Sequence, residues 1–210
     1  MSGKKVCIFD IDNTLTHAAN ANYKTCPGLI SCSTNPDFCP AWPNKSGTSS
    51  AVLNTVKACR KGGYEVAVAT AESGLESYNP KQVKFLQNVL GEDLYNTPML
   101  QNSCTAQNYN YLMCTGQKTD HPCCNTEHPD KTGMYFNIMD HLGIHPSEFQ
   151  NSIVFDDAQS NLTTANFLGM KTCQASLNCG GKYCDTGCGI PNGCVHLVSS
   201  PQDDNLTGVV

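Results

Sequence analysis

The chain has 210 residues, 40% of them hydrophobic, which is enough for one ordinary domain with a sizeable core. Lysine and arginine number 13 against 18 aspartates and glutamates, and a net charge of −5 disfavours a protein that binds nucleic acid by neutralising phosphates. No apolar run approaches the roughly 20 residues of a membrane-spanning helix, so we expect no membrane association.

The first predicted strand, residues 6–9, ends in two acidic residues. Its four consecutive apolar residues are typical of a short strand buried on both faces. Asp10 and Asp12 follow, where open α/β sheets place their ligand crevice, outside the carboxyl ends of the strands. Carboxylates at alternate positions of an extended chain point in opposite directions. We therefore expect a bend directly after Asp10, in a loop to which the Asn-Thr pair at 13–14 is suited.

The next segment, 17–47, has no sustained helical or strand period and contains three cysteines and four prolines. It is predicted to be an irregular insertion stapled by disulfides rather than a separate domain. Trp42 is interpreted as an aromatic plug that anchors this loop, the alternative being a contact to substrate. His17 is expected to be a surface histidine, the alternative being a residue that lines a pocket.

Regular structure returns between residues 48 and 101. Ser49-Ser50 predicts the start of a helix that Gly62-Gly63 ends, and residues 64–69 form a strand that runs into Thr70. Asn79-Pro80 opens a second helix with its stop at Gly91. A short third strand is expected at 97–101, followed by a second irregular, cysteine-bearing insertion at 102–130.

The last regular part of the chain runs from residue 130 to 174. A helix begins near Lys131 and ends at Gly143, and a buried strand at 152–155 ends in Asp156-Asp157. A further helix stops at Gly169 and a strand follows at 170–174. This alternation of short apolar strands and amphipathic helices predicts a mainly parallel sheet with helices on both faces. In the tail, 175–210, residues 195–198 are expected to form an edge strand.

The chain has 14 cysteines. Cys7 and Cys59 lie in apolar patterns and are expected to be plain core residues, whereas the other twelve occupy loops and favour disulfides in an oxidising compartment. The adjacent Cys123 and Cys124 are expected to have separate partners. Zinc ranks below disulfides because the tail lacks a Cys-x2-Cys pair. The first strand follows Met1 with no signal peptide, so a cytoplasmic protein with reduced thiols is the alternative.

Reactive side chains lie at the ends of four predicted strands or helices. They are the two aspartates at 10 and 12, Thr70, Lys131, and the two aspartates at 156–157. Because the carboxyl ends of parallel strands share one edge, these groups can converge there. Clustered carboxylates repel one another unless a cation lies among them, and oxygen-only ligands fit Mg²⁺. A carboxylate can also act as a nucleophile toward phosphate, with Thr and Lys binding the phosphoryl oxygens.

The order and spacing of these motifs resemble the haloacid dehalogenase (HAD) superfamily of aspartate-based phosphohydrolases. Asp10-Ile11-Asp12-Asn13-Thr14 matches its Asp-x-Asp-x-Thr signature, and Val68-Ala69-Thr70 matches its hydrophobic strand ending in Thr or Ser. Lys131, 25 residues before Asp156, is similar to its third motif, and Val154 to Asp157 with Asn161 is similar to its acidic fourth motif. The resemblance spans residues 4–174.

The resemblance implies a role for each matching residue. Asp10 is the nucleophile and a side-chain ligand of Mg²⁺. Asp12 is the general acid and base, and its backbone carbonyl also contacts the metal. Thr70 and Lys131 orient the phosphoryl group. The fourth-motif pair contributes Asp156 as a metal ligand and Asp157 as an assisting residue, through a water-mediated contact to the metal or by pairing with Lys131.

Each candidate also has a simpler interpretation. The first two aspartates could lie in a solvated turn, the aspartates at 156–157 could cap a helix, and Thr70 could merely end a strand. Lys131 could be a solvated lysine, and Lys118 in the same inserted region is the alternative to it.

The predicted organisation is a single domain, 1–210, with a three-layer Rossmann-like (HAD-like) α/β fold. Its core comprises 4–16, 48–101 and 130–174, with a cap-like insertion at 17–47, a second insertion at 102–130 and a cysteine-rich tail at 175–210. We expect a monomeric Mg²⁺-dependent phosphatase whose reduced caps leave the site open to bulky phosphorylated substrates. The alternatives are a HAD-like binding scaffold that uses its cysteine-rich loops, and a phosphotransferase.

Overall fold

The computed structural model describes residues 3–22, 24, 26, 28–70, 79–91, 111–113, 131–175, 187–191 and 194–199. The strands are β1 (Val6–Phe9), β2 (Leu29–Ser31), β3 (Gly47–Ser49), β4 (Glu65–Thr70), β5 (Tyr111–Met113), β6 (Ile153–Asp156) and β7 (Lys171–Gln174). The α-helices are α1 (Ser50–Lys61), α2 (Pro80–Leu90), α4 (Thr132–Leu142), α5 (Gln159–Phe167) and α6 (Val195–Ser199). Three further helical turns are η1 (Ile11–Leu15), η2 (Pro36–Phe38) and η5 (Pro146–Asn151). None of these described helices is long and apolar enough to cross a membrane.

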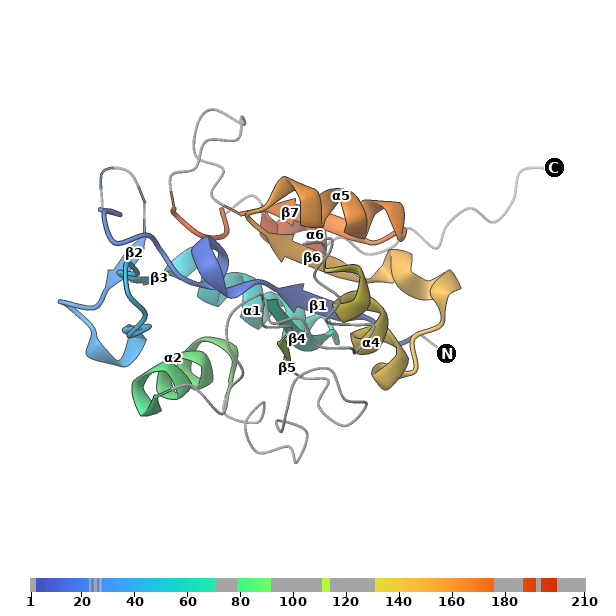
Figure 1. The fold of residues 1–210 in the computed structure, drawn as a ribbon, viewed down its shortest axis with the longest axis horizontal. Coiled ribbons are helices and arrows are strands. Elements are labelled where there is room, and N and C mark those ends of the chain that lie inside the picture. Colours follow the sequence, from blue (N-terminus) through green and yellow to red (C-terminus); the bar gives the residue numbers. More distant parts are fainter. Residues whose placement is uncertain are drawn as a thin grey trace.

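Strand β1 lies at the centre of a five-stranded parallel sheet with the order β5-β4-β1-β6-β7 (Figure 1). Phe9, the last residue of β1, pairs with Val68 of β4 and with Phe155 of β6. The carboxyl ends of these three strands therefore lie at the same edge of the sheet. The mainly parallel sheet predicted from the sequence is confirmed.

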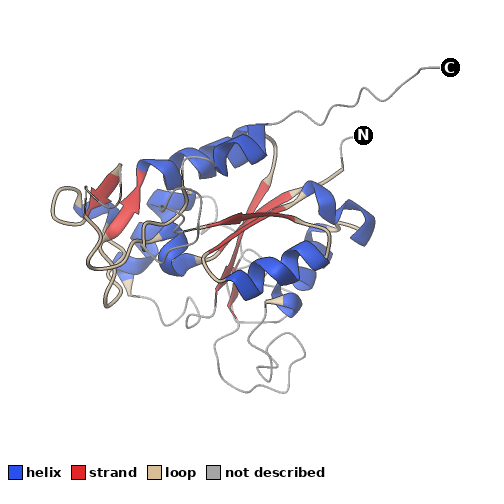
Figure 2. Ribbon diagram, turned by 90° about the horizontal axis from the view of Figure 1, so that it is seen from above, coloured by secondary structure: helices blue, strands red, loops and turns tan. Residues whose placement is uncertain are grey.

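Helices cover both faces of this sheet, which gives the fold three layers (Figure 2). Alternate residues of β1 face opposite layers, as the two-residue period of a strand requires. Cys7 and Phe9 pack with the buried residues of α1, α2 and α6, whereas Val6 and Ile8 pack with those of α4 and α5. All four are fully buried, so β1 is enclosed on both faces.

The helix boundaries follow the capping signals in the sequence. The Ser49 side chain accepts a hydrogen bond from the backbone N–H of Val52 at the start of α1. Asn79 and Gln82 form a reciprocal capping box at the start of α2. Gly143 ends α4 in the left-handed conformation, with φ of 65°. These local signals depend on neighbouring residues alone, which is why the sequence predicts them well.

Two short elements differ from the sequence-based expectations. Residues 195–199 form helix α6, not an edge strand, and the prediction was wrong because Cys194 and Val198 are both buried at helical spacing. Strand β5 lies within the segment 102–130 that was predicted to be irregular. Three residues are too few to show a period, and β5 is defined by pairing with β4. The strand expected at 97–101 lies outside the described residues.

The insertion at 17–47 is also more regular than predicted. Its β2 pairs with β3 as a small antiparallel sheet, with Leu29 opposite Ser49. Trp42 is buried, and its ring lies edge-on to that of Phe85 on α2, with ring centroids 5.9 Å apart. This contact confirms the interpretation of Trp42 as a plug that anchors the loop.

The eight described cysteines form four disulfides: Cys7–Cys59, Cys26–Cys188, Cys32–Cys39 and Cys173–Cys194. Cys7 and Cys59 are buried as predicted, but the expectation that they are plain core residues was wrong. Cys7 lies on the face of β1 that α1 covers, and the two Cα atoms are 6.3 Å apart, within disulfide reach. The other six cysteines, including Cys123 and Cys124, lie outside the described residues.

The described part of the tail packs against η1 and the chain that follows it. The Ile190 N–H donates to the Thr14 carbonyl at 3.2 Å, and the Ala18 N–H donates to the Gly187 carbonyl at 2.9 Å. Gly189 has a φ of 66°, and a Cβ there would lie 2.8 Å from the Thr14 carbonyl oxygen and 3.1 Å from the His17 ring. Only glycine therefore fits this close approach without strain.

This packing buries His17 completely, so the expectation of a surface histidine was wrong. Burial lowers the pKa of His17 to about 4, although the Gly47 backbone opposes the shift. The sequence around His17 has no apolar periodicity from which its burial could be predicted. The residues that cover it come from β3 and from the distant tail.

A thiol count tests the disulfide framework. Since all eight described cysteines are paired, we expect at most the six other cysteines to react in denaturant without reductant, against all 14 after reduction. Peptide mapping of the unreduced chain should recover a Cys7–Cys59 cross-link. More than six reactive thiols, or unlinked Cys7 and Cys59 peptides, would contradict the framework.

The buried His17 predicts acid-sensitive stability. Its pKa is lowered in the folded state, so below about pH 6.5 the unfolded chain takes up a proton that the folded chain does not. As the pH falls from about 6.5 to about 4, this difference should remove about 3 kcal/mol from the free energy of unfolding. Urea titrations of His17→Leu should show a shallower pH dependence than the wild type. The exposed His196→Gln is the control, and an equal flattening in both variants would refute the assignment.

Candidate active site

The bend predicted after Asp10 is formed by the turn η1. The Asp10 N–H donates to the Phe155 carbonyl at 2.9 Å and so continues the pairing with β6. The chain then turns sharply, with Asn13 in the left-handed region at φ of 54°. The Thr16 backbone N–H and hydroxyl both donate to the Ile11 carbonyl at 3.0 Å, which closes the turn.

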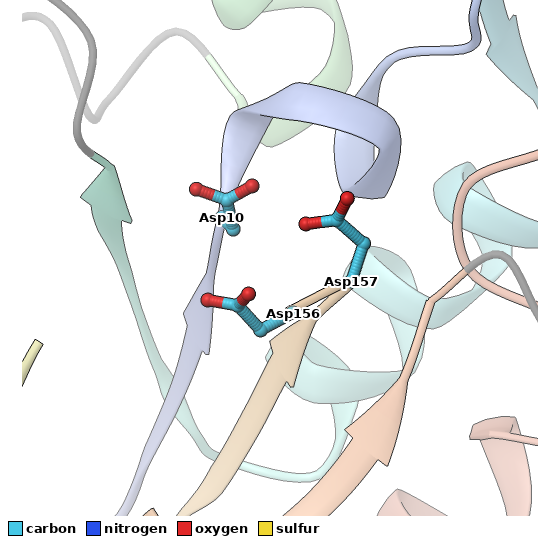
Figure 3. A group of neighbouring side chains, drawn as sticks. All are labelled: Asp10, Asp156 and Asp157. Carbon is cyan, nitrogen blue, oxygen red and sulfur yellow. The ribbon is translucent and has the colours of Figure 1, made fainter. Parts of the chain in front are cut away.

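Three carboxylates converge where β1 and β6 end (Figure 3). Asp10, Asp156 and Asp157 each offer one oxygen atom, and these oxygens all lie within 4.8 Å of one another. Asp10 is 6% exposed and Asp156 is 1% exposed, so two of the carboxylates are shielded from water. Adjacent positions in the sheet register bring Asp10 and Asp156 together although they are far apart in the sequence.

The Lys131 ammonium group lies between the two buried carboxylates. Its Nζ is 2.6 Å from Asp10 Oδ1 and 2.7 Å from Asp156 Oδ2. Lys131 is the residue directly before α4, and it is 4% exposed. The structure therefore places Lys131 where the sequence predicted it, while the alternative, Lys118, lies outside the described residues.

Burial and neighbouring charges shift the pKa values of the charged side chains in this site. Burial raises the pKa of Asp10 to about 7, with Lys131 opposing the shift and Asp156 adding to it. Burial alone would lower the pKa of Lys131, but the two carboxylates outweigh it and raise that pKa above its usual value. Burial also raises the pKa of Asp157. The site therefore stabilises positive charge.

Neighbouring polar groups hold the fourth-motif carboxylates in place. Asp156 Oδ1 accepts the backbone N–H of Ala158 at 2.9 Å, and both Asp156 oxygens accept the Asn161 amide at 3.1 Å. Asp156 thus holds the residue before α5 while it faces Lys131. The N-cap residue of α5 is Ala158 and no side chain caps the helix, so the interpretation of the two aspartates as helix caps was wrong. Asp157 Oδ2 accepts the Asn13 amide at 3.2 Å, which joins η1 to β6.

Thr70 and Asp12 occupy different parts of the same edge. Thr70 is the buried last residue of β4, two positions beyond the residue that pairs with Phe9, and β4 contacts η1. The Asp12 carboxylate does not belong to the 4.8 Å group. It instead lies 2.7 Å from Lys45 of the insertion, with its side chain 34% exposed. Sequence reasoning missed Lys45, since nothing in its local pattern marks it.

The donor set fits a hard divalent cation. The three convergent groups are all carboxylates, and within the described part of the chain no histidine or cysteine joins them. Oxygen ligands of this kind suit Mg²⁺. The side chains of Asp10, Asp156 and Asp157 could therefore hold the ion.

Removal of the buried ammonium group should destabilise the fold. Lys131→Met leaves two buried carboxylates without their cation, which should lower the free energy of unfolding by about 3–5 kcal/mol in EDTA. Urea denaturation measures the change, and the exposed Lys171→Met should stay within about 0.5 kcal/mol of the wild type. Equal stability of the two variants would show that Lys131 does not offset the negative charges of Asp10 and Asp156.

No protein-family model and no curated protein matches the chain. The similar solved structures include a HAD hydrolase, family IA, variant 3, from Entamoeba histolytica, with 12% identity and a TM-score of 0.45 over 93% of this chain and all of that one. A structure described as a dehalogenase has 12% identity and a TM-score of 0.46, over 89% of this chain and 90% of that one. A HAD family enzyme from Bacteroides thetaiotaomicron, in complex with magnesium and inorganic phosphate, has 12% identity and a TM-score of 0.41, over 84% and 97%. The sheet order and helix layers of the described residues are those of a three-layer α/β fold with a parallel central sheet.

Proposed function

We propose that this protein is a Mg²⁺-dependent phosphatase that hydrolyses phosphomonoesters through an aspartyl-phosphate on Asp10. The observation that carries the proposal is the buried Lys131 ammonium group, which bridges Asp10 and Asp156 where the parallel strands end. A cation held beside a buried carboxylate nucleophile suits a site that receives a phosphoryl dianion. The order of the four motifs along the chain supports the same reaction class.

In the first step of the proposed reaction, a carboxylate oxygen of Asp10 attacks the phosphorus atom. The new bond joins Asp10 to phosphorus, and the bond from phosphorus to the ester oxygen breaks. Asp12 gives a proton to the departing oxygen, so the leaving group departs as an alcohol. Lys131 and Thr70 bind the non-bridging oxygens, where negative charge is spread in the transition state.

In the second step a water molecule attacks the phosphorus of the aspartyl-phosphate. Asp12, now a carboxylate, takes a proton from this water, and the bond between phosphorus and Asp10 breaks. Inorganic phosphate leaves, and Asp10 is restored as a carboxylate. Asp12 is therefore a general acid in the first step and a general base in the second, so its side chain must reach the side of the phosphoryl group opposite Asp10.

The side chains of Asp10, Asp156 and Asp157, with the backbone carbonyl of Asp12, are the groups that would hold Mg²⁺. When bound, the ion supplies positive charge that offsets the repulsion between these carboxylates and the phosphoryl oxygens. Asn161 keeps Asp156 oriented for this role, because its amide donates to both oxygens of that carboxylate.

The accessible position of Asp12 supports an open site. Its side chain is about a third exposed and lies outside the group of three carboxylates, although Lys45 of the insertion at 17–47 contacts it. Such a site could admit a phosphate ester attached to a bulky group. Transfer of the phosphoryl group to an alcohol instead of water would use the same residues, and an assay that counts both free phosphate and a phosphorylated acceptor separates the two.

The central test is the loss of Asp10. With p-nitrophenyl phosphate and Mg²⁺, we expect Asp10→Asn to lower kcat by more than about 10³-fold, because the amide cannot form the covalent intermediate. EDTA should abolish wild-type turnover, and added Mg²⁺ should restore it. Asp140→Asn, an exposed carboxylate on α4, is the matched control and should keep wild-type activity. Unchanged turnover in Asp10→Asn or in EDTA would overturn the proposal.

A further inference from the structure

The end of the insertion returns to the signature turn and is fixed there by backbone pairing. The Ser46 N–H donates to the His17 carbonyl, and the His17 N–H donates to the Gly47 carbonyl, both at 2.9 Å. Ala18 and Lys45 form an antiparallel bridge, and the Ala19 N–H donates to the Asn44 carbonyl at 2.8 Å. The backbone of Lys45 is therefore held beside the residues that follow η1.

The Lys45 side chain extends from this backbone to the signature itself. Its Nζ lies 2.7 Å from Asp12 Oδ1 and donates to Asn13 Oδ1 at 3.1 Å. The side chain is only 14% exposed, whereas the Asp12 side chain is 34% exposed. Lys45 is thus the more enclosed partner of this ion pair.

The contact also joins the insertion to the buried carboxylates. Asn13 accepts from Lys45 through its oxygen and donates to Asp157 through its amide nitrogen, at 3.2 Å. A continuous set of contacts therefore runs from Lys45 through Asn13 to Asp157. The insertion does more than border the site, because one of its side chains takes part in the same polar network.

We propose that Lys45 is a positioning residue that holds the Asp12 carboxylate on the leaving-group side of the site. This inference rests on the proposed phosphatase function, in which Asp12 must reach the departing oxygen. An aspartate that is a third exposed would otherwise sample several rotamers, and proton transfer requires a heavy-atom distance of roughly 2.6–3.2 Å. An ion pair with a lysine whose backbone is fixed restricts the rotamers that the Asp12 side chain can adopt.

The proposal also predicts how the effect of Lys45 depends on the leaving group. Proton transfer to the leaving oxygen matters little when the leaving group is a stable anion such as p-nitrophenolate. It matters greatly when the leaving group is an aliphatic alkoxide. A displaced Asp12 should therefore slow the hydrolysis of aliphatic phosphate esters more than that of p-nitrophenyl phosphate.

The test compares leaving groups in Lys45 variants. With Mg²⁺ present, kcat is measured for p-nitrophenyl, phenyl and glycerol phosphate, in rising order of leaving-group pKa. For Lys45→Met we expect a loss of about 10²-fold with glycerol phosphate and less than about threefold with p-nitrophenyl phosphate. Lys45→Arg should recover most of the loss, since it keeps the charge. Lys57→Met, an exposed lysine on α1, is the control and should match the wild type.

The outcomes separate this inference from the function on which it rests. A wild type active on the series, with a Lys45→Met loss that is equal for all three esters or absent, overturns the role of Lys45 alone. A wild type inactive on every ester overturns the phosphatase function and this inference with it. If Lys45→Met does not fold, Lys45→Gln takes its place. Crystal structures add a second readout, in which the Asp12 carboxylate should move in Lys45→Met and stay in Lys45→Arg, and an unmoved Asp12 in Lys45→Met contradicts the proposal.

Discussion

The ion triad of Asp10, Lys131 and Asp156 is the interaction on which the rest of the site depends. A parallel sheet brings the carboxyl ends of β1 and β6 together, and burial of the two carboxylates there raises the pKa of Asp10. Such a group is costly unless a cation lies among its members, and the Lys131 ammonium lies within 2.7 Å of both. The fold thus builds a region in which negative charge is concentrated and partly compensated. The proposed function uses this region to hold a metal ion and a phosphoryl group.

Around this triad, distant parts of the chain hold the signature turn from several sides. Lys45 of the insertion contacts Asp12 and Asn13, and Asp157, directly after β6, accepts a hydrogen bond from Asn13. The tail contacts the chain at Thr14 and Ala18, and the Cys26–Cys188 disulfide links it to the insertion. A turn with two non-helical positions, one of them left-handed, gains little stability from its own sequence. Its shape therefore depends on these long-range contacts, and the disulfides keep them in place.

The elements with strong local signals were predictable from the sequence. The caps at Ser49 and Asn79 and the stop at Gly143 depend on neighbouring residues, and the four apolar residues of β1 are typical of a strand buried on both faces. Short elements without a period were not predictable. Strand β5 exists through its pairing with β4, and α6 is defined by burial of its apolar residues next to α1. The burial of His17 likewise results from residues that are far away in the sequence.

The sequence by itself determined which groups stand at the ends of the core elements, because the order of strands and helices places Asp10, Thr70, Lys131 and Asp156 there. It also determined that several carboxylates lie at one edge of the sheet, where their mutual repulsion requires a cation. Only the tertiary structure decided which groups meet. Side chains that pair through space, such as Cys7 with Cys59 and Lys45 with Asp12, carry no mark in their local sequence. The physical reason is that helix caps and strand periods are local, whereas an ion pair or a disulfide depends on distances that exist only after the chain has folded.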